Sequence, residues 1–173
     1  MNMYDEIWGI AEDNFGIITS AKAESIGVSR QNLVAMERRG NLTRLSHGVY
    51  QVKHHVIGPN DAFAVSVAMV GGSAYLRGAS VIALLGLAPT NPGEFHIGSA
   101  KRVRRRLPRG FRVKDRTACD TVEYEGIRCQ RVTDALETAR AEGSMELDRI
   151  SDAAAAACEK GLMTDEERAK FQG

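Results

Sequence analysis

The sequence predicts an α+β fold, with an N-terminal winged helix-turn-helix over residues 1–57 and a small α+β domain over residues 60–173. Two helical segments and a hairpin follow one another between residues 20 and 50 with the spacing of a helix-turn-helix. Beyond residue 60, short β-branched segments predict a mainly antiparallel sheet, and capped helical segments follow at the C-terminal end. Gly58-Pro59-Asn60 is rich in chain breakers, so we place the domain boundary there.

The helices of the N-terminal part are delimited by capping residues. The hydroxyls of Thr19-Ser20 can accept hydrogen bonds from unpaired backbone N–H groups, which predicts a helix over residues 21–26. Gly27 ends this helix, because glycine adopts a positive φ without a Cβ clash. Ser29 caps the next helix, over residues 30–39. An earlier helix is expected over about residues 4–13, with three side chains facing inward: Ile7, Trp8 and Ile10.

The helix over residues 30–39 has two distinct faces. Leu33 and Met36 fall on one side at helical periodicity, and we expect them to pack into a core. Gln31, Ala35 and Arg38 form an i, i+4, i+7 stripe on the opposite side. Glutamine can pair with adenine, arginine can pair with guanine, and an exposed alanine can meet a thymine methyl group. The stripe is therefore suited to a DNA major groove.

A β-hairpin is expected to follow as the wing. The segments 42–45 and 49–52 contain β-branched and aromatic residues that favour strands, and Gly48 allows a tight turn between them. Basic side chains on this hairpin can contact DNA phosphates. The candidate DNA-binding residues of the helix and the hairpin are Ser29, Arg30, Gln31, Asn32, Ala35, Arg38, Arg39, Arg44, His47 and Lys53.

Charge is sorted along this part of the chain. Residues 1–28 hold five acidic residues and one basic residue, whereas residues 29–57 hold five basic residues and one acidic residue. A plain solvated surface has no reason to separate its charges by element, whereas a surface that faces DNA does. The alternative is an ordinary helical hairpin with a solvated charged face.

The second part is expected to alternate helices, strands and further helices. Two apolar helices are predicted over residues 61–70 and 78–85, and Thr164 and Glu167 form a capping box for a short final helix. Four short strands are predicted over residues 94–97, 110–113, 121–124 and 127–130, followed by helices over residues 133–142 and 144–160.

A second basic segment lies between the predicted strands. Residues 101–116 hold nine basic residues and one acidic residue, whereas residues 132–173 hold ten acidic and five basic residues. The segment is either a second surface for DNA phosphates or a basic hairpin neutralised by the acidic C-terminal helices. The residues of the candidate second basic surface are Lys101, Arg102, Arg104, Arg105, Arg106 and Arg109.

The sequence gives little support for catalysis. The composition, with 43% hydrophobic residues and a net charge of +1, is that of an ordinary globular protein. The three cysteines are odd in number and lack C-x-x-C spacing, which favours reduced thiols in a cytoplasmic protein. No signal peptide and no membrane-spanning run is visible. The histidines are scattered, and no nucleophile elbow or phosphate-binding loop occurs. We therefore expect no metal, no cofactor and no enzymatic activity.

An ordered set of short motifs runs through the N-terminal part: Gly16-Ile17-Ile18-Thr19-Ser20-Ala21, Gly27, Ser29-Arg30, Leu33, Arg39-Gly40-x-Leu42 and Gly48-Val49-Tyr50. In these motifs the chain resembles the AbiEi-type antitoxin family of type IV toxin–antitoxin systems, which are bacterial transcriptional regulators. A looser likeness continues through Arg77-Gly-Ala-Ser80, Leu85-Gly86-Leu87 and Phe95-His-Ile97.

The resemblance implies binding of double-stranded DNA at inverted repeats in the protein's own promoter, with repression of a two-gene operon. It also implies a functional link to a nucleotidyltransferase toxin without a stable complex. The leading hypothesis is thus a sequence-specific repressor that acts as an antitoxin and regulates its own operon. The alternatives are a protein-interaction module and a stand-alone regulator without antitoxin activity.

Overall fold

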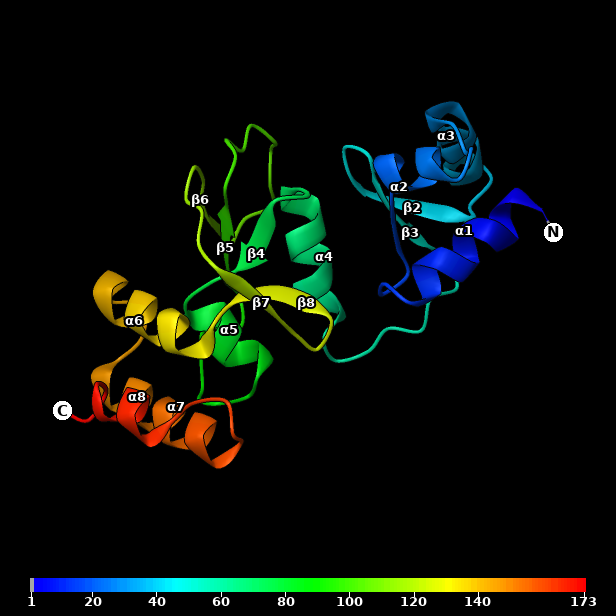
Figure 1. The fold of residues 1–173 in the computed structure, drawn as a ribbon. Coiled ribbons are helices and arrows are strands. Elements are labelled where there is room, and N and C mark those ends of the chain that lie inside the picture. The colour runs from blue at the N-terminus through cyan, green and yellow to red at the C-terminus, as the bar shows by residue number, and fades with distance from the viewer. Residues whose placement is uncertain (1) are drawn as a thin grey trace. The chain divides into compact units, whose positions relative to one another are not determined.

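The structure is a computed structural model that describes residues 2–173. It shows an α+β chain that divides into two compact units, the first running to Met69 and the second starting at Val70 (Figure 1). The α+β class predicted from the sequence is confirmed.

The first unit places three helices against a three-stranded antiparallel sheet, and a fourth helix follows the sheet in the chain. The strand order of the sheet is β1-β3-β2. Strands β2 and β3 form a hairpin, and β1, which lies between the first two helices in the chain, pairs with β3. The elements are α1 (Met3–Glu12), β1 (Ile17–Thr19), α2 (Ser20–Ser25), α3 (Arg30–Arg38), β2 (Leu42–Ser46), β3 (Val49–Val52) and α4 (Asp61–Val70).

The caps predicted for α2 and α3 are present. The Thr19 side chain accepts a hydrogen bond from the backbone N–H of Lys22, and the Ser29 side chain accepts one from Asn32. Gly27, after α2, has a φ of +83°. These caps fix the turn between the two helices, so the sequence alone sets where α3 begins.

The core of the first unit forms between the helices and the sheet. Leu33 and Met36 are buried, as predicted, together with Ile7. Trp8 and Ile10 are partly buried and pack against this core. The full set of buried residues in the core cluster is Ile7, Ala11, Ile18, Ala23, Val28, Leu33, Met36, Leu42, Tyr50 and Val52. Every one of them precedes the predicted domain boundary.

The wing differs in detail from the prediction. Strand β2 extends to Ser46, and the pairing of β2 with β3 shifts between Arg44 and Ser46, which leaves Leu45 as a bulge. The turn is therefore shorter than predicted and centres on His47-Gly48, where Gly48 has a φ of +70°. The positive φ at this position is the reason that a glycine is needed there.

Two contacts attach α4 to the first unit. The ring of His55 contacts the carboxylate of Asp61 at the start of the helix, and the Ser46 hydroxyl on the wing donates to the Met69 carbonyl oxygen at 3.4 Å. The compact first unit accordingly extends to Met69 and includes nearly all of α4. The boundary at Gly58–Asn60 remains a prediction about which fragment folds alone.

The second unit is built on a five-stranded sheet with strand order β6-β5-β4-β8-β7. Pairs β4–β5 and β7–β8 are antiparallel, whereas pairs β4–β8 and β5–β6 are parallel. The sheet is mixed, so the prediction of a mainly antiparallel sheet was wrong. The elements are β4 (Ala74–Leu76), α5 (Ala79–Leu84), β5 (Phe95–Ser99), β6 (Phe111–Lys114), β7 (Thr121–Tyr124), β8 (Ile127–Gln130), α6 (Val132–Glu142), α7 (Leu147–Glu159) and α8 (Asp165–Ala169).

One of the two parallel pairs joins β5 to β6, and the other involves strand β4, which was not predicted from the sequence. This strand is short and fully buried, so it shows no alternation of polar and apolar residues. It lies at the centre of the sheet, and Tyr75 packs closely over Gly98 of β5. A central strand that is buried on both faces is difficult to distinguish from a buried helix by periodicity.

The C-terminal helices largely follow the prediction. The Thr164–Glu167 capping box of α8 is present. Helix α7 begins at Leu147, three residues later than predicted. Gly143 adopts a left-handed conformation and the chain then forms a turn before the helix starts. Among residues 2–173, no helix is long and apolar enough to cross a membrane.

Candidate nucleic-acid interface

Helix α3 presents one face to the core and the other to solvent. The Ser29 hydroxyl accepts a hydrogen bond from the Asn32 N–H at 3.2 Å, which fixes the first turn of the helix. Leu33 is fully buried and Met36 is 5% exposed. Gln31 and Arg38 lie on the exposed side. The orientation expected from the periodicity is the one observed.

A shallow hollow of about 560 Å³ runs along the outer side of α3. Of the candidate DNA-binding residues, five line it, and Val34 lines it too. Ala35 is half-buried there, so its methyl group contributes to the floor of the hollow rather than to a projecting contact. The lining residues are Arg30, Gln31, Val34, Ala35, Arg38 and Arg39. The arrangement offers three guanidinium groups and one amide around small apolar side chains.

Sequence reasoning missed Val34. It lies between the core-facing and solvent-facing positions of the helix, and it is half-buried. The available signal was its position on the helical wheel, where Val34 falls nearer to Arg38 than to Leu33 or Met36. An apolar residue on this face can contact a thymine methyl group.

Three candidates at the start of α3 have different surroundings. The Arg30 Nε atom lies 2.9 Å from a carboxylate oxygen of Glu24, and both side chains are well exposed, at 70% and 48%. Such a surface ion pair contributes at most about 1 kcal/mol, so a phosphate can replace it. The Ser29 side chain is engaged as a cap, and Asn32 is half-buried outside the hollow.

The wing brings two of its candidates together. The Arg44 Nε atom donates to the Ser46 carbonyl oxygen at 3.4 Å, and its Nη2 lies 3.5 Å from Nδ1 of His47. Both side chains are exposed. Lys53 follows strand β3 and is exposed as well. Exposed basic groups of this kind can hold phosphates, and such contacts carry no sequence information.

The second basic surface lies on the connection between β5 and β6. All six of its predicted residues are exposed. The N-terminal part of this connection is held to the residues that follow β6, because the Val103 N–H donates to a carboxylate oxygen of Asp115 at 2.8 Å. The Lys101 carbonyl oxygen also accepts from the Arg116 N–H at 3.4 Å. These two hydrogen bonds fix the start of the connection beside the residues that follow β6.

Acidic neighbours engage the strand that follows this connection. Arg112 lies 3.3 Å from Glu94, and Lys114 lies 3.9 Å from Glu142 at the end of α6. Glu142 also forms a bidentate pair with the buried Arg77, at 2.8 and 3.0 Å. The Arg77 guanidinium lowers the pKa of Glu142, against the opposing effect of partial burial. The predicted neutralisation by the C-terminal helices thus involves Lys114 and one α6 carboxylate.

Within the part of the chain that the structure describes, no group of three histidine, cysteine or acidic residues could hold a metal ion. The cysteines Cys119, Cys129 and Cys158 are free thiols. Burial raises the pKa of the Cys129 thiol to about 12, so this thiol stays protonated.

Comparison with known proteins supports the resemblance. Residues 10–53 match the family model described as a transcriptional regulator, AbiEi antitoxin. The match runs from α1 to the residue after β3, and so it contains α3 and the β2–β3 hairpin. The AbiEi-like resemblance inferred from the sequence is confirmed over this segment. A search of curated proteins finds no match.

Proposed function

We propose that the first unit is a winged helix-turn-helix that binds double-stranded DNA, and that the protein is a transcriptional repressor. The order α1-β1-α2-α3-β2-β3 and the sheet order β1-β3-β2 support the winged-helix assignment. The observation that carries the proposal is the exposed hollow of α3, because its arginines and its glutamine lie on the side away from the core. The family match over this same segment supports it further.

In this proposal, α3 enters the major groove. Gln31 and Arg38 contact base edges, where glutamine prefers adenine and arginine prefers guanine. Val34 contacts a thymine methyl group, and Ala35 forms part of the apolar floor beneath it. Arg30 exchanges its partner Glu24 for a backbone phosphate, and Arg39 contacts a phosphate at the other end of the helix. Arg44, His47 and Lys53 contact phosphates from the wing.

The second basic surface extends the contact along the duplex in this proposal. Its six basic residues are all exposed in the second unit: Lys101, Arg102, Arg104, Arg105, Arg106 and Arg109. Phosphate contacts of this kind add affinity for any DNA sequence and carry no base preference.

The regulatory role proposed for the chain follows the family. The protein binds inverted repeats in its own promoter and represses an operon that also encodes a nucleotidyltransferase toxin. It counters that toxin as an antitoxin without forming a stable complex, and it acts in the cytoplasm as a regulator without enzymatic activity or a cofactor.

A footprint on the DNA upstream of the protein's own gene tests this function. The proposal expects protection of one or two short sites, and loss of protection when Arg38→Ala is introduced. Protection should survive Arg149→Ala, a matched control that removes an exposed arginine on α7. If the protein fails to retard this DNA in a gel even at low salt, the protein-interaction alternative replaces the proposal.

A further inference from the structure

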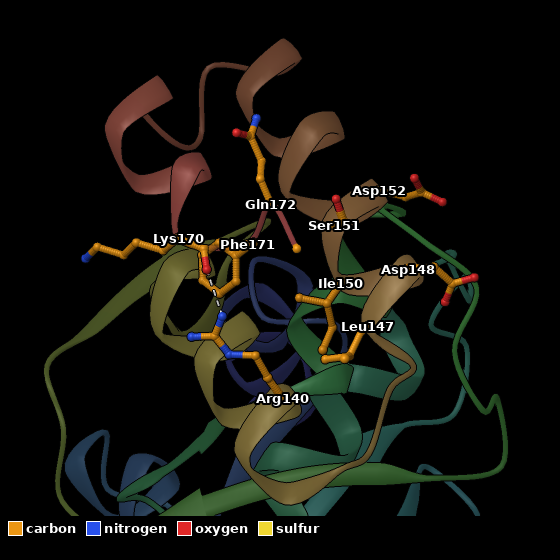
Figure 2. A pocket seen from close by; sticks show the side chains of 10 residues that line it. Arg140, Leu147, Asp148, Ile150, Ser151, Asp152, Lys170, Phe171 and Gln172 are labelled. Carbon is orange, nitrogen blue, oxygen red and sulfur yellow. Dashed lines mark hydrogen bonds between the residues drawn. The ribbon is translucent and has the colours of Figure 1, made fainter.

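A hollow of about 550 Å³ lies among the C-terminal helices of the second unit, and we call it the α7 pocket. Its apolar part comes from Leu147, Ile150 and Phe171 (Figure 2). Ile150 and Phe171 are buried, but Leu147 is 70% exposed. Leu147 does not stand alone but lines the pocket together with Ile150 and Phe171, and a contiguous apolar surface of this kind is a feature of interaction sites. The floor of the pocket is therefore suited to covering by another apolar surface.

Opposite charges flank this apolar floor. Asp148 and Asp152 lie one turn apart on α7 and project on one side of the pocket, whereas Lys170 projects on the other side, next to Arg140 (Figure 2). Across residues 2–173, neither aspartate is part of an ion pair. The α7 pocket thus has an acidic side, an apolar centre and a basic side.

The basic side is held rigidly. The Arg140 Nη1 atom donates to the Lys170 carbonyl oxygen at 2.8 Å, and its guanidinium lies 4.9 Å from the centre of the Phe171 ring. These two contacts fix the positive charge against the apolar floor. A partner that meets this surface therefore encounters a preformed charge pattern.

We propose that a second copy of this chain covers the α7 pocket and forms a symmetric homodimer. A two-fold axis that passes between the acidic and basic sides brings Asp148 and Asp152 of each copy opposite Arg140 and Lys170 of the other. The two Leu147 side chains then meet over the apolar centres. A surface with acid on one side and base on the other is complementary to itself under this operation, as a two-fold interface requires.

The charge pattern favours a second copy over nucleic acid. The carboxylates of Asp148 and Asp152 would repel phosphates, so the α7 pocket is unsuited to DNA. The dimer does not rest on the proposed function, because it is measured without DNA. A two-fold dimer would nevertheless match the two half-sites of an inverted repeat.

Sedimentation equilibrium of the full chain across the micromolar range tests the proposal. The wild-type protein should dimerise as its concentration rises, and Leu147→Asp should raise the dissociation constant by at least about tenfold. Aspartate is favourable in the first turn of a helix, so this substitution should leave α7 intact. Val56→Asp is the matched control, because Val56 is also an exposed apolar residue, at 86%, and lies outside the α7 pocket.

Charge exchange identifies the symmetry. A chain with Asp148→Lys and Asp152→Lys has bases on both sides of the α7 pocket, and a chain with Lys170→Glu gains an acid on its basic side. Each variant should dimerise more weakly than the wild type, and an equimolar mixture of the two should associate again. Circular dichroism checks that both are folded. A wild-type protein that stays monomeric overturns the proposal, and so does a dimer that none of these substitutions weakens.

Discussion

Replacing Arg104, Arg105 and Arg106 with alanine should flatten the salt dependence of DNA binding without changing sequence preference. The three side chains are exposed on the connection between β5 and β6. If each contacts one phosphate, the triple variant loses three contacts. Each phosphate contact contributes about 0.9 to the slope of log K against log[salt] for duplex DNA, so the slope should fall by roughly two to three.

The structure indicates which basic residues of the second unit the triple variant should leave unchanged. Arg112 and Lys114 already lie against Glu94 and Glu142, so their substitution would alter contacts within the second unit as well as DNA binding. The control variant replaces Arg131 and Arg149, which are exposed but lie outside the basic segment. This variant tests whether a loss of net positive charge alone changes the slope.

Fluorescence anisotropy with a labelled duplex at several salt concentrations measures the slope. The same titrations with a specific and a random duplex measure sequence preference. An unchanged slope in a folded triple variant would refute the reasoning, because it would mean that these arginines do not contact phosphates. An equal change in the control variant would show a general effect of charge instead.

Three further predictions concern stability. Ser29→Ala removes the cap of α3 and should lower the free energy of unfolding by about 1 kcal/mol in urea denaturation, whereas Ser25→Ala, at a surface position of α2, should cost less. Glu142→Gln leaves the buried Arg77 without a charged partner and should cost about 1–2 kcal/mol at pH 7, a modest value because Glu142 is 35% exposed. The folded state lowers the pKa of Glu142 below its ordinary value of 4.5. The difference in unfolding free energy between the wild type and Glu142→Gln should therefore be complete above pH 4.5 and shrink as the pH falls below it. A difference that persists at low pH would contradict the ion-pair explanation. A fragment of residues 1–57 should be folded, as measured by circular dichroism, because it contains the whole core cluster. A fragment extended through α4 should be more stable, because it regains the His55–Asp61 contact. An unfolded shorter fragment would place the domain boundary later in the chain.

Local signals determined most of the first unit. Ser29 and Gly27 fix the ends of α2 and α3, and Leu33 and Met36 show which face of α3 packs. These features depend on residues that are close in sequence, so a single sequence contains them. Strand β1 was missed because it has only three residues and pairs with β3, which lies about thirty residues later in the chain.

The second unit was harder to predict because its sheet depends on distant pairings. The boundaries of β7 and β8 were correct, since a short turn joins them. The parallel pairing of β4 with β8 joins segments more than fifty residues apart, and β4 carries no polar alternation. The ion pairs of Glu142 and Glu94 depend on the same sheet topology. The sequence therefore showed that acidic and basic residues are segregated, but not which basic residues form ion pairs.

Binding of specific and random duplexes by Arg38→Ala and Arg44→Ala tests most directly whether α3 reads DNA sequence. A footprint first defines the specific site. Arg38→Ala, and likewise Gln31→Ala, should cost about 1–3 kcal/mol on the specific duplex and much less on the random one, because a base contact is lost. Arg44→Ala on the wing should weaken both duplexes alike. If all three variants lose equal affinity for both duplexes, α3 does not read the sequence and the account is contradicted.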